Sequence, residues 1–184
     1  MKGFRVIRTE RILQALQELS VGDLERDTIR GFPGTTKRQF ATQPVRIVEM
    51  RLTPYEPSGK LLAEATANNE GRLYNPQILF AEVVYEQEDT PQNITFTGSD
   101  NEPHHIQQIQ FANNNAQVRC NCLDFHYRFA QYDARNDALY GNPPPPYQRR
   151  TDTRPPANPL GVPGICKHVL VLIDELQNVK ILSR

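Results

Sequence analysis

The chain places all three of its cysteines in two short motifs, and the second motif also contains a histidine. Cys120 and Cys122 form a C-x-C pair, and Cys166 and His168 form a C-x-H pair. Thiolate and imidazole are preferred ligands of zinc, and a structural zinc site takes four ligands in a tetrahedron. An odd number of cysteines excludes a closed set of disulfides. The two pairs therefore predict a Zn²⁺ site made by Cys120, Cys122, Cys166 and His168.

The spacing inside each pair predicts the local backbone. Side chains at positions i and i+2 of an extended segment point to the same side, so Cys120 and Cys122 can face one ion from a strand or a tight hairpin end. Residues two apart on a regular helix point about 200° apart around its axis. We therefore expect Cys166 just before a helix and His168 in its first turn, with Gly164 allowing a tight approach. Four protein ligands leave no open position for a substrate, which is typical of a structural zinc site.

The same residues allow other interpretations. His126 lies three residues after Cys122 and is a rival fourth ligand, although a role in aromatic packing suits its surroundings better. His104 and His105 precede a strand-like stretch that contains no cysteine, and we interpret them as surface residues. Three ordinary buried thiols with a surface histidine, or a redox or iron–sulfur site, are the alternatives to zinc.

The chain is neutral as a whole, but its charges are segregated. It carries 21 Lys and Arg against 21 Asp and Glu over 184 residues, a balance that argues against a dedicated nucleic-acid binder. Residues 52–118 contain two basic and nine acidic residues, whereas basic residues are in excess in residues 1–51 and 119–184. An acidic middle between basic ends suggests contacts with neighbours of opposite charge. A solvated surface with chance clustering is the alternative.

Targeting and membrane signals are not evident in the sequence. Residues 1–10 contain no apolar run of the length found in signal peptides. No stretch approaches the roughly 20 apolar residues that a membrane-spanning helix needs. We therefore expect a protein that is made and folded in a cytosol and has no membrane partner. In a reducing cytosol, clustered cysteines more often bind metal or take part in catalysis than form disulfides.

The pattern of apolar residues predicts an α+β fold. Residues 9–22 have helical spacing, with Thr9 as a candidate cap and Gly22 as a candidate end. Residues 45–120 contain short apolar runs punctuated by Gly, Pro and Asn, which predicts an antiparallel sheet of five or six short strands. Residues 111–122 have the pattern of a β-hairpin whose turn is a run of asparagines.

The C-terminal third of the chain has a different composition. Residues 127–140 have a pattern compatible with a helix. Eight of the fifteen prolines fall within residues 143–163, a segment that we expect to wrap the surface of this chain or of a partner. From residue 166 onward the sequence predicts an amphipathic helix. Its apolar stripe comprises Val169, Leu172, Ile173 and Leu176.

Two regions are expected from these elements. Residues 1–44 would form an N-terminal helix and arm, and residues 45–184 would form the antiparallel sheet and the zinc module. In this module the ion would join a β-hairpin at the end of the sheet to the C-terminal α-helix, with residues 123–165 as a long proline-rich insert. Closing a loop of this length restricts the unfolded chain, much as a disulfide does.

The order C-x-C, C-x-H and then an apolar helix resembles the SWIM zinc-finger family. Residues 120–125 match the family's C-x-C-x-x-F, and residues 166–168 match its C-K-H. The resemblance covers residues 104–176 at most, and the spacer between the two pairs is longer here than is usual in the family. It implies a hairpin that carries C-x-C, a helix that begins at C-x-H, a zinc ion between them, and a role in binding nucleic acid or protein.

A second resemblance is to SWIM-like structural proteins of tailed bacteriophages. In these proteins C-x-C-x-D-F is followed by an aromatic stretch, a proline-rich run, N-P and C-K-H. The corresponding residues here are Asp124, Phe125, Phe129, Pro143 to Pro146, Asn158 and Pro159. The resemblance implies a virion component of the neck, tail or baseplate that is made and assembled in the host cytoplasm.

Three classes of function compete. A zinc-stabilised structural subunit, bound to other structural proteins or to copies of itself, best fits the closed site, with residues 28–44 and 141–163 as the expected contacts. A SWIM-type nucleic-acid-binding module is the alternative, supported by the small cluster Arg149, Arg150 and Arg154. The sequence shows no Ser–His–Asp order, phosphate-cradling glycine loop or paired-carboxylate motif, so we do not expect an enzyme.

Overall fold

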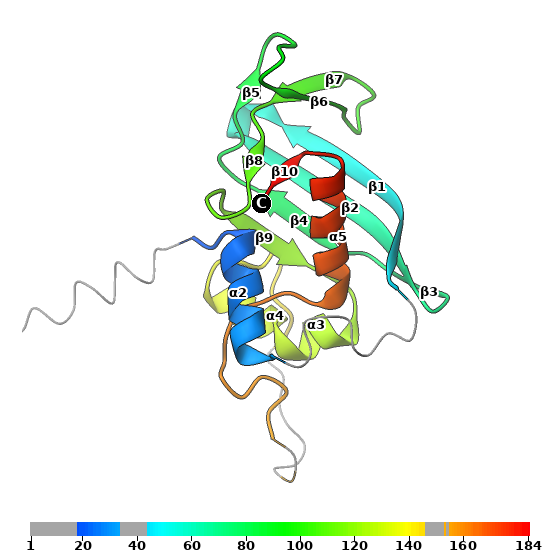
Figure 1. Ribbon diagram of the computed structural model, residues 1–184. Helices are drawn as coiled ribbons and strands as arrows, with labels where there is room; N and C mark the ends of the chain where they lie inside the picture. The colour runs from blue at the N-terminus through cyan, green and yellow to red at the C-terminus, as the bar shows by residue number, and fades with distance from the viewer. Residues whose placement is uncertain (1–17, 34–43, 146–152, 154) are drawn as a thin grey trace, which may run out of the picture.

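The computed structural model describes residues 18–33, 44–145, 153 and 155–184, which form an α+β fold (Figure 1). The larger sheet contains β1 (Arg46–Tyr55), β2 (Lys60–Asn69), β3 (Arg72–Tyr74), β4 (Gln77–Phe80) and β9 (Ala116–Arg119). The smaller sheet contains β5 (Tyr85–Glu86), β6 (Ile94–Thr97) and β7 (Pro103–Ile106). Both sheets are antiparallel, which confirms the predicted fold class. A parallel pair joins β8 (Ile109–Gln110) to β10 (Leu182–Ser183).

The larger sheet is built on one long hairpin. β1 and β2 are each ten residues long, and the 3-10 turn η1 (Glu56–Ser58) connects them. Gly59 ends this turn at φ 58°, a left-handed conformation that glycine adopts without steric strain. β4 pairs with the other side of β2, and β9 pairs with the other side of β4, so that the strand order is β1-β2-β4-β9.

The strands differ from the single sheet of five or six short strands that the sequence predicts. Residues 45–120, all of them described, contain nine strands divided among the two sheets and the β8–β10 pair. The predicted hairpin over residues 111–122 is wrong, because β8 pairs with β10 whereas β9 pairs with β4. This placement sets Val118 opposite Ile78, so that both apolar side chains are buried. The asparagine run is therefore a connection between two sheets.

The first described helix, α2 (Val21–Gly31), begins at a capping box. The Ser20 hydroxyl accepts a hydrogen bond from the Asp23 N–H at 3.1 Å, and the Asp23 carboxylate accepts one from the Ser20 N–H at 3.0 Å. Gly22 therefore lies inside a helix, and the predicted helix end at this residue is wrong. The rest of that prediction, over residues 9–17, lies outside the described residues.

Two short helices follow β9, and one long helix follows the proline-rich segment. α3 (Leu123–Arg128) and α4 (Ala130–Arg135) replace the single helix predicted over residues 127–140. The end of that range lies beside β9 instead, where the Val118 N–H donates to the Ala138 carbonyl at 2.8 Å. α5 (Lys167–Asn178) confirms the predicted C-terminal helix. None of the helices in the described part of the chain is long and apolar enough to cross a membrane.

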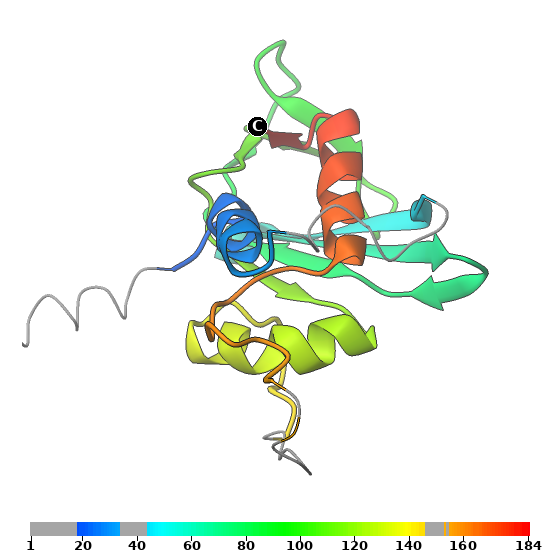
Figure 2. The same ribbon diagram turned by 60° about the horizontal axis from the view of Figure 1, so that its bottom comes forward.

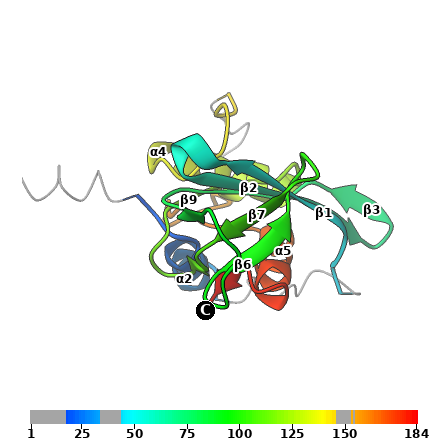
Figure 3. The ribbon, with the colours of Figure 1, turned by 90° about the horizontal axis from the view of Figure 1, so that it is seen from above.

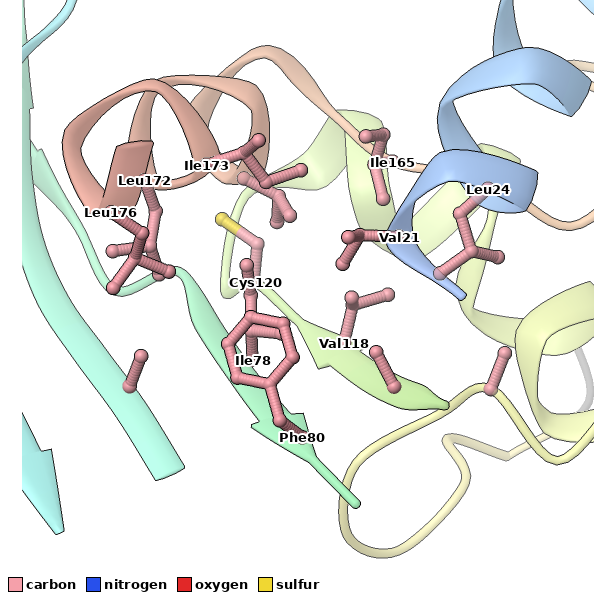
Figure 4. Packing of buried hydrophobic residues seen from close by; sticks show 14 of the residues in the cluster. Val21, Leu24, Ile78, Phe80, Val118, Cys120, Ile165, Leu172, Ile173 and Leu176 are labelled. Atoms are coloured by element: carbon pink, nitrogen blue, oxygen red, sulfur yellow. The ribbon is translucent and has the colours of Figure 1, made fainter. Parts of the chain in front are cut away.

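A hydrophobic core lies between the larger sheet and the helices. α2 and α5 lie on the same side of this sheet (Figure 3), and α3 and α4 lie beside β9 (Figure 2). Figure 4 shows Ile78 and Phe80 of β4 packed near Val21 and Leu24 of α2 and the inner face of α5. The predicted stripe of α5 is entirely buried: Val169, Leu172, Ile173 and Leu176. Each such side chain contributes roughly 1.5–3 kcal/mol when it is removed from water.

The two predicted contact segments, residues 28–44 and 141–163, are described in part. The start of the first segment completes α2 rather than forming an arm. The start of the second follows the chain's own surface, because the Gln131 side chain donates to the carbonyls of Pro144 and Pro145 at 2.8 and 3.1 Å. Parts of both segments lie outside the described residues. Contacts of these segments with neighbouring subunits therefore stay a prediction.

His104 of β7 connects the smaller sheet to the β1–β2 turn. Its Nδ1 atom lies 2.5 Å from a Glu56 carboxylate oxygen in η1, and its Nε2 atom lies 3.0 Å from an Asp100 carboxylate oxygen. The ring also stacks on Phe96 of β6. His104 and His105 are therefore half-buried residues at the surface, with side chains that are 11% and 18% exposed, and the surface interpretation misses only their hydrogen bonds.

We expect the free energy of unfolding to fall as the pH rises through the pKa of His104. Burial lowers this pKa, but hydrogen bonds to Glu56 and Asp100 outweigh burial and raise it above its usual 6.5. Because the protonated ring donates to both carboxylates, its stabilising effect is complete below about pH 6.5 and is lost above the raised pKa. Denaturant unfolding at about pH 6 and pH 9 should show a smaller decrease in His104→Gln than in the wild type or in the control His105→Gln. Equal decreases in all three proteins would contradict this role.

Candidate metal centre

Strand β9 directs Cys120 to the inner face of the larger sheet. Ala116 and Val118 point into the core from β9, and Cys120 continues this two-residue alternation just after the strand ends. All three side chains are buried. Figure 4 shows Cys120 among the core residues of β4, β9 and α5. The strand end predicted for the first ligand is therefore present, directly before Cys120.

Cys122 lies at the N-terminus of a helix and not on the predicted hairpin. It is the N-cap residue of α3, and its Sγ atom accepts the Phe125 N–H at 3.3 Å, the bond that an N-cap side chain makes to the first turn. The chain thus changes from strand to helix between the two cysteines. Their sulfur atoms still face one site, so the predicted convergence of Cys120 and Cys122 holds on a different backbone.

Cys166 and His168 occupy the positions predicted at the start of α5. Cys166 is the N-cap residue and has an extended backbone, with φ −85° and ψ 168°, and His168 lies in the first helical turn. The extended backbone at Cys166 lets both side chains point to one side, which a continuous helix would prevent. Both residues are buried, at 1% and 2% exposure.

The four side chains converge on one point. Their ligand atoms all lie within 4.8 Å of one another. The His168 Nδ1 atom is 3.8 Å from the Cys120 sulfur and 3.9 Å from the Cys166 sulfur. A tetrahedral zinc ion with its usual bond lengths would separate a sulfur ligand from a nitrogen ligand by about 3.6 Å. The cluster can therefore hold one metal ion with small side-chain movements.

The three thiols of the cluster change one another's pKa values. Hydrogen bonds with Cys120 and Cys166 lower the pKa of the Cys122 thiol, to which the Phe125 N–H also donates. The hydrogen bond with Cys122 raises the pKa of Cys120, and burial raises that of Cys166. Three thiolates packed this closely would repel one another. A divalent ion among them would compensate that charge, because a coordinating thiol is held in its deprotonated form.

The end of β3 and its connection to β4 cover one side of the cluster. The Tyr74 ring stacks on the His168 imidazole, with 4.1 Å between centroids and 21° between planes. Asn121, which separates the two cysteines, donates to Asn75 Oδ1 at 3.0 Å and accepts the Asn75 N–H at 2.8 Å. These contacts hold both the C-x-C turn and the imidazole against the larger sheet.

The segment before Cys166 is held in place by close packing and by a buried amide. A Cβ atom on Gly164 would lie 2.3 Å from Thr28 Oγ1 and 2.8 Å from a ring carbon of Phe129, so only glycine fits, which confirms the expected tight approach. The buried Asn158 side chain donates to the carbonyls of Arg128 and Val162 at 2.8 and 2.7 Å. It therefore joins the end of α3 to the segment that leads into α5.

Other predicted residues lie apart from the centre. His126 is exposed on α3 and does not belong to the cluster, so it does not replace a ligand. The cluster Arg149, Arg150 and Arg154 lies outside the described residues. Tyr74 was not identified from the sequence, because nothing in its spacing connects a residue of β3 with a helix that starts at residue 167.

His168→Ala should weaken metal binding far more than His126→Ala does. His168 faces the three sulfurs, whereas His126 points to solvent on a neighbouring helix. Losing a ligand should exceed the roughly 10–100-fold loss typical of an outer-shell partner. Competition with a chromophoric chelator measures both affinities, and circular dichroism checks that α5 is retained. Similar affinities in the two variants would exclude His168 as a ligand.

Comparisons with family models, curated proteins and solved structures find no match to this chain. The likeness to the SWIM family therefore depends on the two ligand motifs and on the helix that follows them. On structural grounds alone, four buried side chains from two distant parts of the chain form a candidate metal centre.

Proposed function

We propose that this protein is a structural subunit of a macromolecular assembly and that a zinc ion stabilises it. The observation that carries the proposal is the complete burial of a ligand set of three thiols and one imidazole. Sulfur and nitrogen ligands in a tetrahedral arrangement suit zinc, and four protein ligands leave no coordination position for water or substrate. Such a centre would serve the stability of the fold and not a reaction, so we propose no enzymatic activity.

Zinc would act by joining two distant parts of the chain. Two ligands follow β9 and two begin α5, so a bound ion closes the loop formed by residues 123–165. Because this site exists only in the folded protein, the free energy of metal binding adds directly to the free energy of folding. The ion would therefore hold α5 on the larger sheet and fix both ends of the insert.

Charge and exposed apolar groups support a role in assembly. Residues 52–118 contain nine acidic and two basic residues, an arrangement suited to contacts with basic surfaces. Leu123 at the start of α3 and Leu160 in the insert are 69% and 63% exposed. Apolar side chains exposed on a monomer are available for burial against another subunit. The partners would be other structural proteins or copies of this chain.

The order of motifs supports a more specific proposal, that the assembly is the virion of a tailed bacteriophage. C-x-C-x-D-F, the aromatic stretch, the prolines, N-P and C-K-H follow one another as in SWIM-like structural proteins of such phages. The chain would then be made and assembled in the host cytoplasm and would belong to the neck, tail or baseplate.

A SWIM-type nucleic-acid-binding module is the second candidate. Arg149, Arg150 and Arg154 form a small basic cluster in the insert, and the SWIM likeness implies such a role. Affinity for phosphates depends on the number of contacts made by Lys and Arg, and three arginines supply few. The net charge of zero also favours the structural proposal.

The purified protein should contain about one zinc ion per chain, as expected for a closed four-ligand site. Chelation should lower the melting temperature, because the ion links β9 to α5. Zinc should restore it, whereas magnesium and calcium should not, since both prefer oxygen ligands. The His168→Ala variant should respond weakly to either treatment. A metal-free protein that is fully folded and unaffected by added zinc would contradict the proposal.

Native purification should recover the protein in a multi-copy protein particle without tightly bound nucleic acid. Titration with labelled DNA and RNA at about 50 and 200 mM salt should show no binding tighter than roughly 10⁻⁶ M. The two salt concentrations identify binding through phosphates, because such binding weakens steeply with salt. Submicromolar, salt-dependent binding that is lost when Arg149, Arg150 and Arg154 are changed to Ala would favour the nucleic-acid module instead.

A further inference from the structure

The chain that leads into Cys166 is hydrogen-bonded to helix α2, far from it in sequence. The Thr28 hydroxyl accepts the Ile165 N–H at 2.8 Å and donates to the Leu24 carbonyl at 2.7 Å. Thr28 is 2% exposed and Ile165 is 1% exposed. Because the Thr28 hydroxyl donates its proton to the Leu24 carbonyl, its lone pairs are directed toward the Ile165 N–H. Ile165 is the residue directly before the ligand Cys166. The contact therefore sets the position of Cys166 relative to α2.

Asp133 makes a parallel contact from α4. Its Oδ1 atom accepts the Gly164 N–H at 2.8 Å, and its side chain is completely buried. Burial raises the pKa of this carboxyl well above its usual range. Its Oδ2 atom has no hydrogen-bond partner among the described residues, so the Oδ1 bond to Gly164 is the contact that offsets the cost of burying this side chain. Two successive backbone amides, those of Gly164 and Ile165, are thus held by side chains from two different helices.

These two contacts leave the second ligand pair little freedom. Gly164 lies so close to Thr28 and Phe129 that even a Cβ atom would clash, so the segment has no room to shift toward α2. Cys166 follows at once as the N-cap of α5. Any displacement of α2 would therefore pull on the backbone of residues 164 and 165 and change the position of the Cys166 sulfur relative to the other three ligands.

We propose that Thr28 and Asp133 are positioning residues for Cys166, and that Thr28 couples metal binding to the docking of α2. The inference deepens the proposed zinc centre and depends on it. Coupling is reciprocal: if docked α2 places Cys166 for the ion, then the bound ion must stabilise docked α2 by the same factor. A bound ion would thus stabilise the docked position of α2 as well as that of α5.

Affinity measurements on four variants test the coupling. Thr28→Val keeps the shape of the side chain but removes the acceptor for Ile165, and zinc affinity should fall by about 5–150-fold, the usual range of coupling between sites. Thr28→Ser keeps the hydroxyl and should rescue wild-type affinity. Asp133→Leu should resemble Thr28→Val, whereas Asp133→Asn retains an acceptor for Gly164 and should remain close to the wild type.

Hydrogen exchange on the wild-type protein gives a second readout that does not require any variant to fold. Zinc should slow exchange of the α2 amides relative to the chelated protein, and the β6–β7 hairpin should serve as an unaffected control. Unchanged α2 exchange, or a Thr28→Val affinity equal to that of the wild type in a protein that does bind zinc, would overturn the coupling alone. A wild-type protein that binds no zinc would overturn both the coupling and the proposed zinc centre.

Discussion

The convergence of two short motifs on one buried point is the constraint on which the rest of the structure depends. Cys120 and Cys122 leave the larger sheet at the end of β9, and Cys166 and His168 begin α5. The chain between them must therefore leave this point and return to it. α3 and α4 make the outward path beside β9, and the segment fixed by Asn158 makes the return. The insert is therefore a loop whose two ends lie at the same ligand cluster.

Around the ligand cluster, apolar packing stabilises the fold, whereas directional contacts fix the positions of the ligands. The buried stripe of α5 packs on the inward side chains of β4 and β9, and this apolar burial holds α5 on the larger sheet. The effect is large but has no preferred direction. It would tolerate small shifts of one element along another. Directional contacts remove that freedom: Tyr74 stacks on His168, Asn121 pairs with Asn75, and Thr28 holds Ile165. Ligand geometry, which tolerates errors of only tenths of an ångström, needs this second kind of contact.

The sequence predicted the parts of the structure that are encoded locally. The candidate ligands could be identified because cysteine is rare in this chain and its spacing carries chemical meaning, and α5 could be identified because its apolar stripe repeats with the helical period. Strand partners were missed because pairing is not local: β9 lies beside β4, and β10 returns to β8. The start of α2 was missed because the capping box at Ser20 interrupts an apolar pattern that otherwise continues. Tyr74, Thr28 and Asp133 reach the site only through tertiary packing.

The late position of the second motif has a consequence for synthesis on the ribosome. Residues 123–168, 46 in number, must be translated after the first motif before a four-ligand site can exist. At roughly 5–20 residues per second this takes about 2–9 s. During that interval Cys120 and Cys122 belong to a nascent chain without their buried surroundings, and exposed thiols are open to oxidation. Oxidative stress would therefore damage chains still being made, whereas finished molecules keep all three sulfurs out of reach.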